Sequence, residues 1–186
     1  STRPGSEPVS EGDELKRVIP VIKGLQGLLQ VPISIDTDKA AVAQEALRAG
    51  AAIVNDVSAL RGDPGMTTVV QAAEAVILMH RGGESPKTMQ DAPRYKDVVA
   101  EVKAFLIERK DFFKASGGDA ERLLVDPGIG FGKTLEHNLS LIKRVAEFET
   151  VAPVVLGVSR KSFLGRIIAG AGPEDRLEGS LALACW

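Results

Sequence analysis

The segment RLLVDPGIGFGKT, residues 122–134, decides the class of the fold. Its apolar run ends at Asp126 and Pro127, and three glycines and Lys133 follow. A short continuous apolar run that ends in a polar residue and a glycine turn is typical of a parallel strand covered on both faces. Residues 137–148 then have the spacing of a helix. The segment therefore predicts one strand, a loop and a helix.

The glycine loop fits neither of the common nucleotide-binding motifs. In the P-loop pattern G-x-x-x-x-G-K-[ST], the first glycine falls on Pro127. Proline fixes φ and has no N–H, so the loop lacks a turn conformation and a donor that a phosphate needs. In the dinucleotide pattern G-x-G-x-x-G, the third glycine falls on Lys133. The glycines are instead expected to let the backbone fold tightly over a flat ring.

Four further segments repeat the strand pattern of residues 122–127. They are VPISID (31–36), AAIVND (51–56), AAEAVILMH (72–80) and APVVLGVSR (152–160). Helical patterns cover residues 13–29, 39–49, 66–73, 95–116, 137–148 and 176–186. Strands that alternate with helices predict the α/β class with a parallel sheet.

Within the α/β class, we predict a (β/α)8 TIM barrel, here a partial barrel with about five of the eight strands. The helix at residues 13–29 needs a strand before it, and the last helix needs one after it, so we expect the whole protein to have at least seven strands. A complete barrel typically has about 250 residues, whereas this chain has 186. We expect residues 1–186 to form a single truncated domain without the first two strands and the last strand.

Composition excludes several classes of protein. The chain carries a formal net charge of −2 and no basic block, so no nucleic acid partner is expected. One cysteine, Cys185, allows neither an internal disulfide nor a multi-cysteine zinc site. The apolar runs are too short for a bilayer, so no membrane association is expected and a cytoplasmic location is predicted.

Every predicted strand ends in a polar or charged group. The residues are Asp36, Asn55 with Asp56, His80, Asp126, and the trio Ser159, Arg160 and Lys161. In a barrel the carboxyl ends of all strands meet at one face, where active sites form. Asp and Asn are also common helix caps and turn formers, and for any single one of them that role is favoured. Asp38 is the more natural cap of the next helix, which leaves Asp36 for the site, and Asn55 and Asp56 can divide ligand contact and turn formation.

Carboxylates, an amide and a lysine in one pocket indicate a ligand with several N–H donors and at least one acceptor. A carboxylate accepts two parallel N–H bonds, and an ammonium group donates to a carbonyl or a ring nitrogen. A 2-amino-4-oxo heterocycle such as a pterin or guanine has this edge. An oxygen-only Mg²⁺ site is the competing use of the carboxylates. His80 has no fixed partner in the sequence, so a structural role is favoured over acid–base chemistry.

Six motifs, in order along the chain, resemble the dihydropteroate synthase family. They are STRPG (1–5), SIDT (34–37), IVND (53–56), LMH (78–80), DPGIGFGKT (126–134) with HN (137–138), and GVSRKSFLG (157–165). The resemblance implies a (β/α)8 barrel and a transferase of an alkyl group other than methyl. The family condenses 6-hydroxymethyl-7,8-dihydropterin diphosphate with p-aminobenzoate to give 7,8-dihydropteroate and pyrophosphate in folate biosynthesis, and it is a sulfonamide target.

The resemblance also assigns roles to residues of this chain. The pterin-binding set is Asp36, Asn55, Asp126 and Lys161, of which Lys161 and Asp126 are the catalytic pair. The set for p-aminobenzoate and diphosphate is Thr2, Arg3, Pro4, Phe131, Lys161 and Ser162. Asp126, or Asp36 in the alternative assignment, pairs with the 2-amino group and ring N–H. Lys133 and Arg160 rank below Lys161 as direct ligands.

Two motifs of the family are missing from this sequence, which bears on activity. The Asn used for Mg²⁺ and diphosphate in the first strand and the Arg-x-His motif of the last strand are both absent. Mg²⁺ is therefore an expected cofactor without a ligand in this chain, and the 186 residues alone are expected to be inactive or nearly so. The resemblance further implies a homodimer for the full-length protein.

Two alternative functions are kept open. One is a pterin-binding methyltransferase domain that delivers methyltetrahydrofolate to a corrinoid protein, and the other is a non-catalytic pterin-binding fragment. The STRPG and SRKS segments favour the synthase over the methyltransferase.

Overall fold

A parallel sheet forms the centre of the molecule. The computed structural model describes residues 7, 9–83 and 93–185. The strands are β1 (Ser34–Asp36), β2 (Ile53–Asp56), β3 (Ala75–Met79) and β4 (Leu123–Asp126). They pair in the order β1-β2-β3-β4, and every pairing is parallel. Because neighbours in the sheet follow the order of the chain without a reversal, the winding is that of a barrel, as predicted, and not of a doubly wound sheet.

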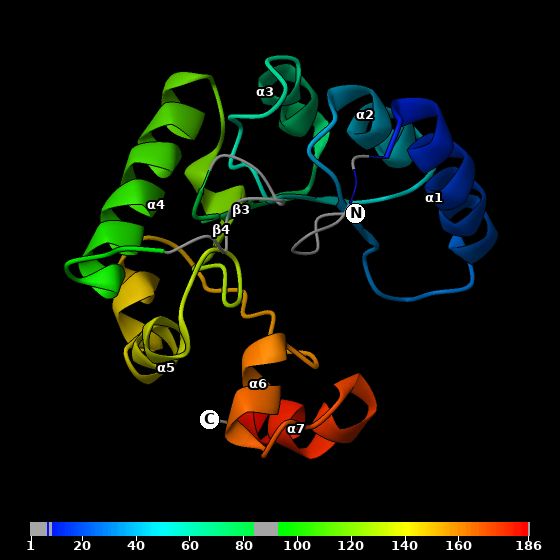
Figure 1. Ribbon diagram of the computed structural model, residues 1–186. Coiled ribbons are helices and arrows are strands. Elements are labelled where there is room, and N and C mark those ends of the chain that lie inside the picture. The colour runs from blue at the N-terminus through cyan, green and yellow to red at the C-terminus, as the bar shows by residue number, and fades with distance from the viewer. Residues whose placement is uncertain (1–6, 8, 84–92, 186) are drawn as a thin grey trace.

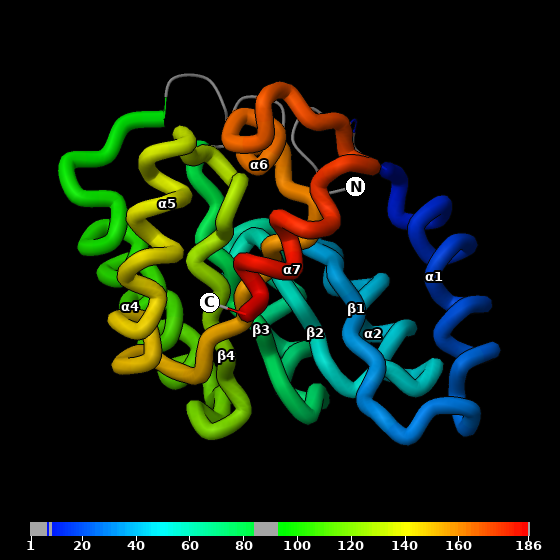
Figure 2. The backbone as a smooth tube through the Cα atoms, turned by 90° about the horizontal axis from the view of Figure 1, so that it is seen from below, coloured from blue at the N-terminus to red at the C-terminus, as the bar shows by residue number. Residues whose placement is uncertain are grey.

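The helices follow the strands around this sheet. They are α1 (Glu11–Leu25), α2 (Ala40–Arg48), α3 (Met66–Val69), α4 (Val98–Ala115), α5 (Leu135–Lys143), α6 (Ser162–Ile167) and α7 (Leu177–Cys185). Short 3-10 turns are η1 (Val70–Ala72), η2 (Ala120–Arg122), η3 (Val145–Thr150) and η4 (Pro173–Arg176). Figure 1 shows α1 to α5 in an arc around the sheet, with α6 and α7 on its other side. In Figure 2, α7 passes in front of the strands. We call the side toward the arc the convex face and the opposite side the concave face.

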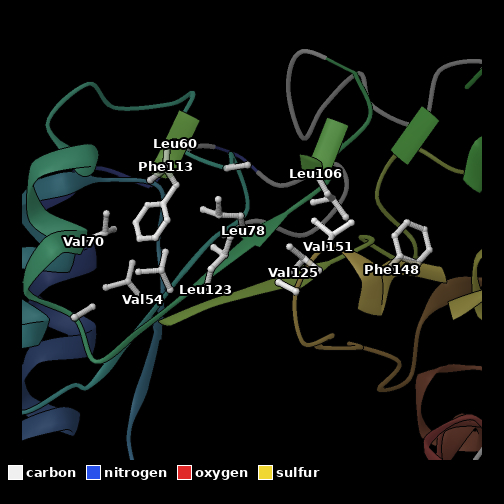
Figure 3. Packing of buried hydrophobic residues seen from close by; sticks show 14 of the residues in the cluster. Val54, Leu60, Val70, Leu78, Leu106, Phe113, Leu123, Val125, Phe148 and Val151 are labelled. Carbon is white, nitrogen blue, oxygen red and sulfur yellow. The ribbon is translucent and has the colours of Figure 1, made fainter. Parts of the chain in front are cut away.

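The convex face is apolar because alternate residues of each strand point toward the helices. Ile35, Val54 and Val76 are buried at neighbouring positions of β1, β2 and β3. Helix α4 meets this face with a stripe of buried residues at helical spacing: Val99, Val102, Leu106, Arg109 and Phe113. Figure 3 shows side chains of this layer, including Val54, Leu78 and Leu123 from three neighbouring strands. Burial of these side chains stabilises the sheet against the arc of helices.

The predicted fifth strand, residues 152–160, is wrong as a full strand. The segment pairs with β4 through one isolated bridge between Val125 and Val154. Val125 N donates to Pro153 O at 3.0 Å, and Val155 N donates to Val125 O at 2.9 Å. Pro153 has no N–H to extend the ladder, and the chain turns at residues 159–160 before α6 begins. The sheet of the described residues therefore has four strands and one bridge.

Candidate functional site

Strand register places three predicted site residues on the concave face. Asp36 pairs with Asn55, and Asn55 pairs with Ile77 of β3. Paired residues of adjacent strands share a face, and so do residues two apart along one strand. Ile77 pairs with Leu124, and Asp126 lies two residues beyond Leu124. Asp36, Asn55 and Asp126 therefore face the same side of the sheet, near its carboxyl end.

Asp56, the residue after Asn55, faces the convex side of the sheet and forms a turn. The prediction that Asn55 contacts the ligand while Asp56 forms a turn is consistent with this arrangement. Its carboxylate accepts from Ser58 N at 2.7 Å and from Leu60 N at 2.8 Å. The carboxylate thereby holds a loop in which Ala59 and Leu60 have positive φ. The prediction that Asp38 caps α2 is wrong. The N–H of Ala40 is instead accepted by Asp63 Oδ2 at 2.8 Å, a contact across 23 residues.

Asp126 is the buried acid of the concave face, with 7% of its surface exposed. Its Oδ1 accepts from Gly128 N at 2.7 Å. Burial raises the pKa of the Asp126 carboxyl, although the Gly128 N–H and the ammonium group of Lys161 counteract part of the rise. A ligand that donates hydrogen bonds to this carboxylate would stabilise its charged form.

Asn55 offers an unused hydrogen-bonding group on the same face. Its side-chain Oδ1 is buried and has no hydrogen-bond partner among the described residues. An unsatisfied buried amide oxygen is costly, and native structures contain few of them. This atom is therefore placed to accept a hydrogen bond from a ligand.

Asp36 occupies the edge of the concave face and retains exposed surface. Crowding of its carboxyl group by protein atoms is the main reason that its pKa is raised to about 6. Repulsion from Asp38 and Asp56 adds to the rise, and Lys161 opposes it. Asp36 therefore changes charge in a range well above that of an ordinary aspartate.

Lys161 supplies the positive charge of the site from outside the sheet. It is the residue before the first turn of α6, and its Nζ lies 4.4 Å from the centroid of the Phe131 ring. Burial lowers the pKa of Lys161, whereas Asp126 and Asp36 raise it. An ammonium over an aromatic face is stabilised by the ring quadrupole. Phe131 and Lys161 therefore form one wall of the site, and the charge of Lys161 acts on both Asp126 and Asp36.

The glycine loop packs against the chain itself. Gly128, Gly130 and Gly132 all have positive φ. A Cβ on Gly128 would lie 1.8 Å from His80 O, and one on Gly130 would lie 3.3 Å from Lys161 Cδ. Asn138 Oδ1 accepts from Gly130 N at 2.7 Å, and its Nδ2 donates to Thr134 O at 2.7 Å. The glycines are thus required by close approach to residues 80–82 and to Lys161.

Lys133 and His80 lie inside this packing, with 4% and 8% of their surfaces exposed. Lys133 Nζ lies 2.9 Å from His80 Nδ1 and donates to Phe131 O at 3.0 Å. Burial lowers the pKa of Lys133 to about 7. His80 has its pKa lowered to about 2, mainly by burial and then by Lys133, so its ring is neutral at physiological pH.

The remaining predicted residues lie away from this centre or outside the described residues. Thr2, Arg3 and Pro4 are outside the described residues. Ser162 is exposed at the start of α6. Arg160 donates to Glu174 Oε2 at 3.0 Å, and its backbone N–H donates to Ser180 Oγ at 2.7 Å. The guanidinium of Arg160 is therefore engaged with η4.

Sequence reasoning missed the apolar floor of the concave face. Met79 pairs with Asp126 and is buried, and Ile77 pairs with Asn55 one level below. Both residues stand in β3 on the face that carries the acids. The alternation of β3 around the quoted LMH motif contained this signal, because Met79 lies two residues after Ile77. A flat apolar ring whose polar edge faces the acids and the amide fits this floor.

The part of the chain that the structure describes has neither a cluster of metal-binding side chains nor a membrane-spanning helix. Residues 7, 9–83 and 93–185 contain no group of three His, Cys, Asp or Glu that could hold a metal ion. Within the same ranges no helix has the length and apolar character needed to cross a membrane.

Comparison with known proteins identifies the family. The model of the family described as "Pterin binding enzyme" matches residues 1–186. The chain belongs to the pterin binding enzyme family. This family assignment agrees with the concave face, where acids, an amide and a lysine surround an apolar floor.

Individual members of the pterin binding enzymes resemble the chain over its whole length. Dihydropteroate synthase of Escherichia coli K12 is 45% identical over 185 residues, which are 99% of this chain and 65% of that protein. The Mycobacterium leprae enzyme is 47% identical over 191 residues, which cover 98% of this chain and 66% of its own length. The chain thus spans less than two thirds of these relatives.

Solved structures of dihydropteroate synthases share the fold. The Xanthomonas albilineans enzyme with 4-aminobenzoic acid has a TM-score of 0.91 at 43% identity, over 100% of this chain and 66% of its own. The Burkholderia cenocepacia enzyme complexed with 7,8-dihydropteroate has a TM-score of 0.89 at 42% identity, over 99% of this chain and 68% of its own. The Yersinia pestis enzyme in a sulfonamide drug complex has a TM-score of 0.94 at 38% identity, over 99% of this chain and 66% of its own.

Proposed function

We propose that the protein is a dihydropteroate synthase, which joins 6-hydroxymethyl-7,8-dihydropterin diphosphate to p-aminobenzoate and releases pyrophosphate. The observation that carries the proposal is the concave face, where the charge of Lys161 acts on Asp126 and the buried amide oxygen of Asn55 has no partner among the described residues. Relatives with this activity in their names match 98–99% of the chain. Structures similar to this one hold the substrate 4-aminobenzoic acid and the product 7,8-dihydropteroate.

The polar groups match the edge of a pterin ring in number and kind. Asp126 accepts from the 2-amino group and the adjacent ring N–H, as a carboxylate does from two parallel donors. Asn55 Oδ1 accepts from a neighbouring ring N–H, which satisfies its buried oxygen. Lys161 donates to the ring carbonyl or to N5. Asp36 takes the outer edge of the ring, where its own exposure leaves room.

The reaction then depends on positioning and electrostatics. The C–O bond between the pterin methylene and the diphosphate breaks first, and its electron pair leaves with pyrophosphate. The aniline nitrogen of p-aminobenzoate attacks the resulting cation and loses a proton. The negative charge of Asp126 and Asp36 stabilises the cationic pterin more strongly than the neutral one. Holding both reactants in one orientation supplies much of the remaining acceleration.

The second substrate is assigned to the wall formed by Phe131 and Lys161. Phe131 packs against the aromatic ring of p-aminobenzoate, and Lys161 and Ser162 contact its polar groups. Thr2, Arg3 and Pro4 complete this half of the site together with the diphosphate, an assignment that rests on the STRPG motif. Ser162 is accessible for this role at the start of α6.

The expected Mg²⁺ is proposed on the resemblance, and no described residue is assigned to it as a ligand. The acids of the concave face do not gather in a group of three with His or Cys. No step of the proposed reaction is therefore assigned to a metal here. A homodimer is proposed on the resemblance alone, and a cytoplasmic location on the composition of the sequence. Sedimentation of the protein tests the dimer.

Two experiments test the function. Isothermal titration of residues 1–186 with a pterin analogue measures whether the concave face binds its first ligand. A chimera with these residues in place of the aligned 65% of the Escherichia coli enzyme then reports turnover through 7,8-dihydropteroate detected by mass spectrometry. Product from the chimera, and its loss in the Lys161→Ala variant, supports the proposal. A folded chimera that binds the pterin but forms no product favours a non-catalytic binding role.

A further inference from the structure

Lys133 is buried in surroundings that do not explain a lysine by charge pairing. Its hydrogen-bond partners are His80 Nδ1 and the carbonyl oxygen of Phe131, and His80 O lies 3.5 Å away. Buried lysines usually pair with a carboxylate, because desolvation of the ammonium is costly. The charge of Asp126 acts on Lys133, but the hydrogen bonds go to neutral groups. The presence of a buried lysine at this position must therefore be explained by its hydrogen bonds to His80 and Phe131.

His80 is prepared as an acceptor. Its ring is neutral, so the nitrogen that faces Lys133 can accept while the other nitrogen carries the hydrogen. The ring stands edge-on against Phe105, with centroids 4.9 Å apart. Packing against α4 thus fixes the acceptor, and His80 itself directly follows β3. Lys133 therefore bonds to a rigid point at the end of the sheet.

The other end of the contact is the backbone of Phe131. The Phe131 carbonyl accepts from Lys133 Nζ and also from Gly82 N at 3.2 Å. The next residue is held as well, because Tyr95 Oη donates to Gly132 O at 3.1 Å. A carbonyl fixed by two donors fixes the peptide plane beside it. The backbone that carries the Phe131 side chain is therefore tied to residues 80–82, and its ring lies 4.4 Å from Lys161 Nζ.

We propose that Lys133 and His80 form a buried tie that orients Phe131 under Lys161, which makes Lys133 a positioning residue for the p-aminobenzoate half of the site. The inference rests on the proposed function for its substrate and on the hydrogen bonds of Lys133, His80 and Phe131 for its geometry. Lys133 acts from behind the wall and does not touch the substrate.

Hydrogen exchange tests the tie without any ligand. In the Lys133→Met variant of residues 1–186 the stem is kept and the donor is lost, so the Gly82 amide should exchange at least about tenfold faster. Lys110→Met is the matched control, because Lys110 Nζ also donates to a backbone carbonyl, that of Val151. It should leave Gly82 exchange within about twofold of the parent chain. Unchanged Gly82 exchange in Lys133→Met would overturn the tie.

A double-mutant cycle tests the link to the second substrate. Affinity for p-aminobenzoate is measured with a saturating pterin analogue at pH 8, where an amine with a pKa of about 7 is mostly neutral. Lys133→Met should weaken p-aminobenzoate binding about tenfold and pterin binding less than about threefold. In a Phe131→Ala background the same substitution should cost less than about twofold. An equal loss in both backgrounds would show that Lys133 does not act through Phe131.

The outcomes separate the tie from the proposed function. If neither the parent chain nor the chimera with the Escherichia coli enzyme binds p-aminobenzoate beside the pterin, the synthase assignment and the substrate role of Lys133 both fail, while Gly82 exchange still decides the tie. If Lys133→Met does not fold, His80→Phe is measured in its place. That variant keeps the ring against Phe105 and removes the acceptor, so it should accelerate Gly82 exchange and weaken p-aminobenzoate binding in the same way.

Discussion

The two faces of the sheet are built from the same strands and have opposite chemistry. On the convex face, Val54 and Leu78 are fully buried against the helices. On the concave face, Asn55, the residue after Val54 in β2, has a buried oxygen without a partner among the described residues. Asp126 at the end of β4 has a raised pKa. Because side chains of a strand alternate between faces, a run such as IVND serves both. The convex face thus contributes packing against the helices, whereas the concave face combines an apolar floor with polar groups that can bind a ligand.

The largest change in stability is expected from a substitution that removes packing on the convex face. Phe113→Ala removes a side chain that is fully buried on α4, so the free energy of unfolding should fall by about 3–5 kcal/mol. Urea denaturation measures this loss. Pterin affinity of the folded fraction should not change. Phe112→Ala, at the neighbouring position where the ring is 40% exposed, is the control and should cost much less.

Asp126→Asn is expected to have the next largest effect, on affinity. The amide cannot accept two parallel N–H bonds, so pterin binding should weaken about 100-fold in isothermal titration. Stability should hold or rise, because burial disfavours the charged carboxylate. Asp119→Asn at the surface start of η2 is the control. Unchanged affinity in Asp126→Asn would remove this residue from the pterin site.

Asn55→Leu tests whether the amide of Asn55 serves a ligand and not the stability of the fold. Removing an oxygen that has no partner should leave thermal stability unchanged or raise it, while pterin affinity falls about tenfold. Asn138→Leu is its counterpart, because both polar atoms of Asn138 are hydrogen-bonded. That variant should lose about 2–3 kcal/mol of stability. Equal losses of stability in the two variants would contradict the assignment of Asn55 to a ligand.

The smallest effect is a pH dependence at Asp36. Its pKa is raised to about 6 in the folded chain, whereas an unfolded aspartate titrates near 3.9. The folded state therefore binds more protons between these values, and stability falls as pH rises from about 4 to about 6. Asp36→Asn should remove this part of the slope. Melting temperatures of both proteins across pH 4 to 8 measure the difference, and parallel curves would contradict the raised pKa.

The sequence predicted features that depend on local pattern. The alternation of strands and helices indicated a parallel barrel, and the polar residues at strand ends located Asp36, Asn55 and Asp126 at one edge. Helix ends were less well predicted. The predicted helix 13–29 ends at Leu25, because Gly27 turns the chain with positive φ.

Features that depend on distant contacts were not predictable from the sequence. The cap of α2 comes from Asp63, 23 residues away, and no local pattern separates it from Asp38. Lys133 was predicted as a ligand that ranks below Lys161, but it is buried against His80, which lies 53 residues earlier. The fifth strand failed for a related reason, since pairing depends on the geometry of its neighbour as well as on apolar content.

The single bridge between Val125 and Val154 affects the dynamics of the segment that follows it. Helix α6 and Lys161 are joined to the sheet through this bridge and a turn in which Arg160, a non-glycine residue, has φ of 48°. Fewer backbone hydrogen bonds hold residues 154–160 to β4 than hold the four strands to one another, whereas Phe163 and Leu164 of α6 are buried in the core. We therefore expect the segment before α6 to open at a lower free energy than the strands. Lys161 therefore follows a segment with little strand pairing, whereas Asp36 and Asp126 end strands that are paired in the sheet. Relaxation dispersion in residues 156–167, with none in β2 and β3, is the signature of this division on the microsecond to millisecond timescale.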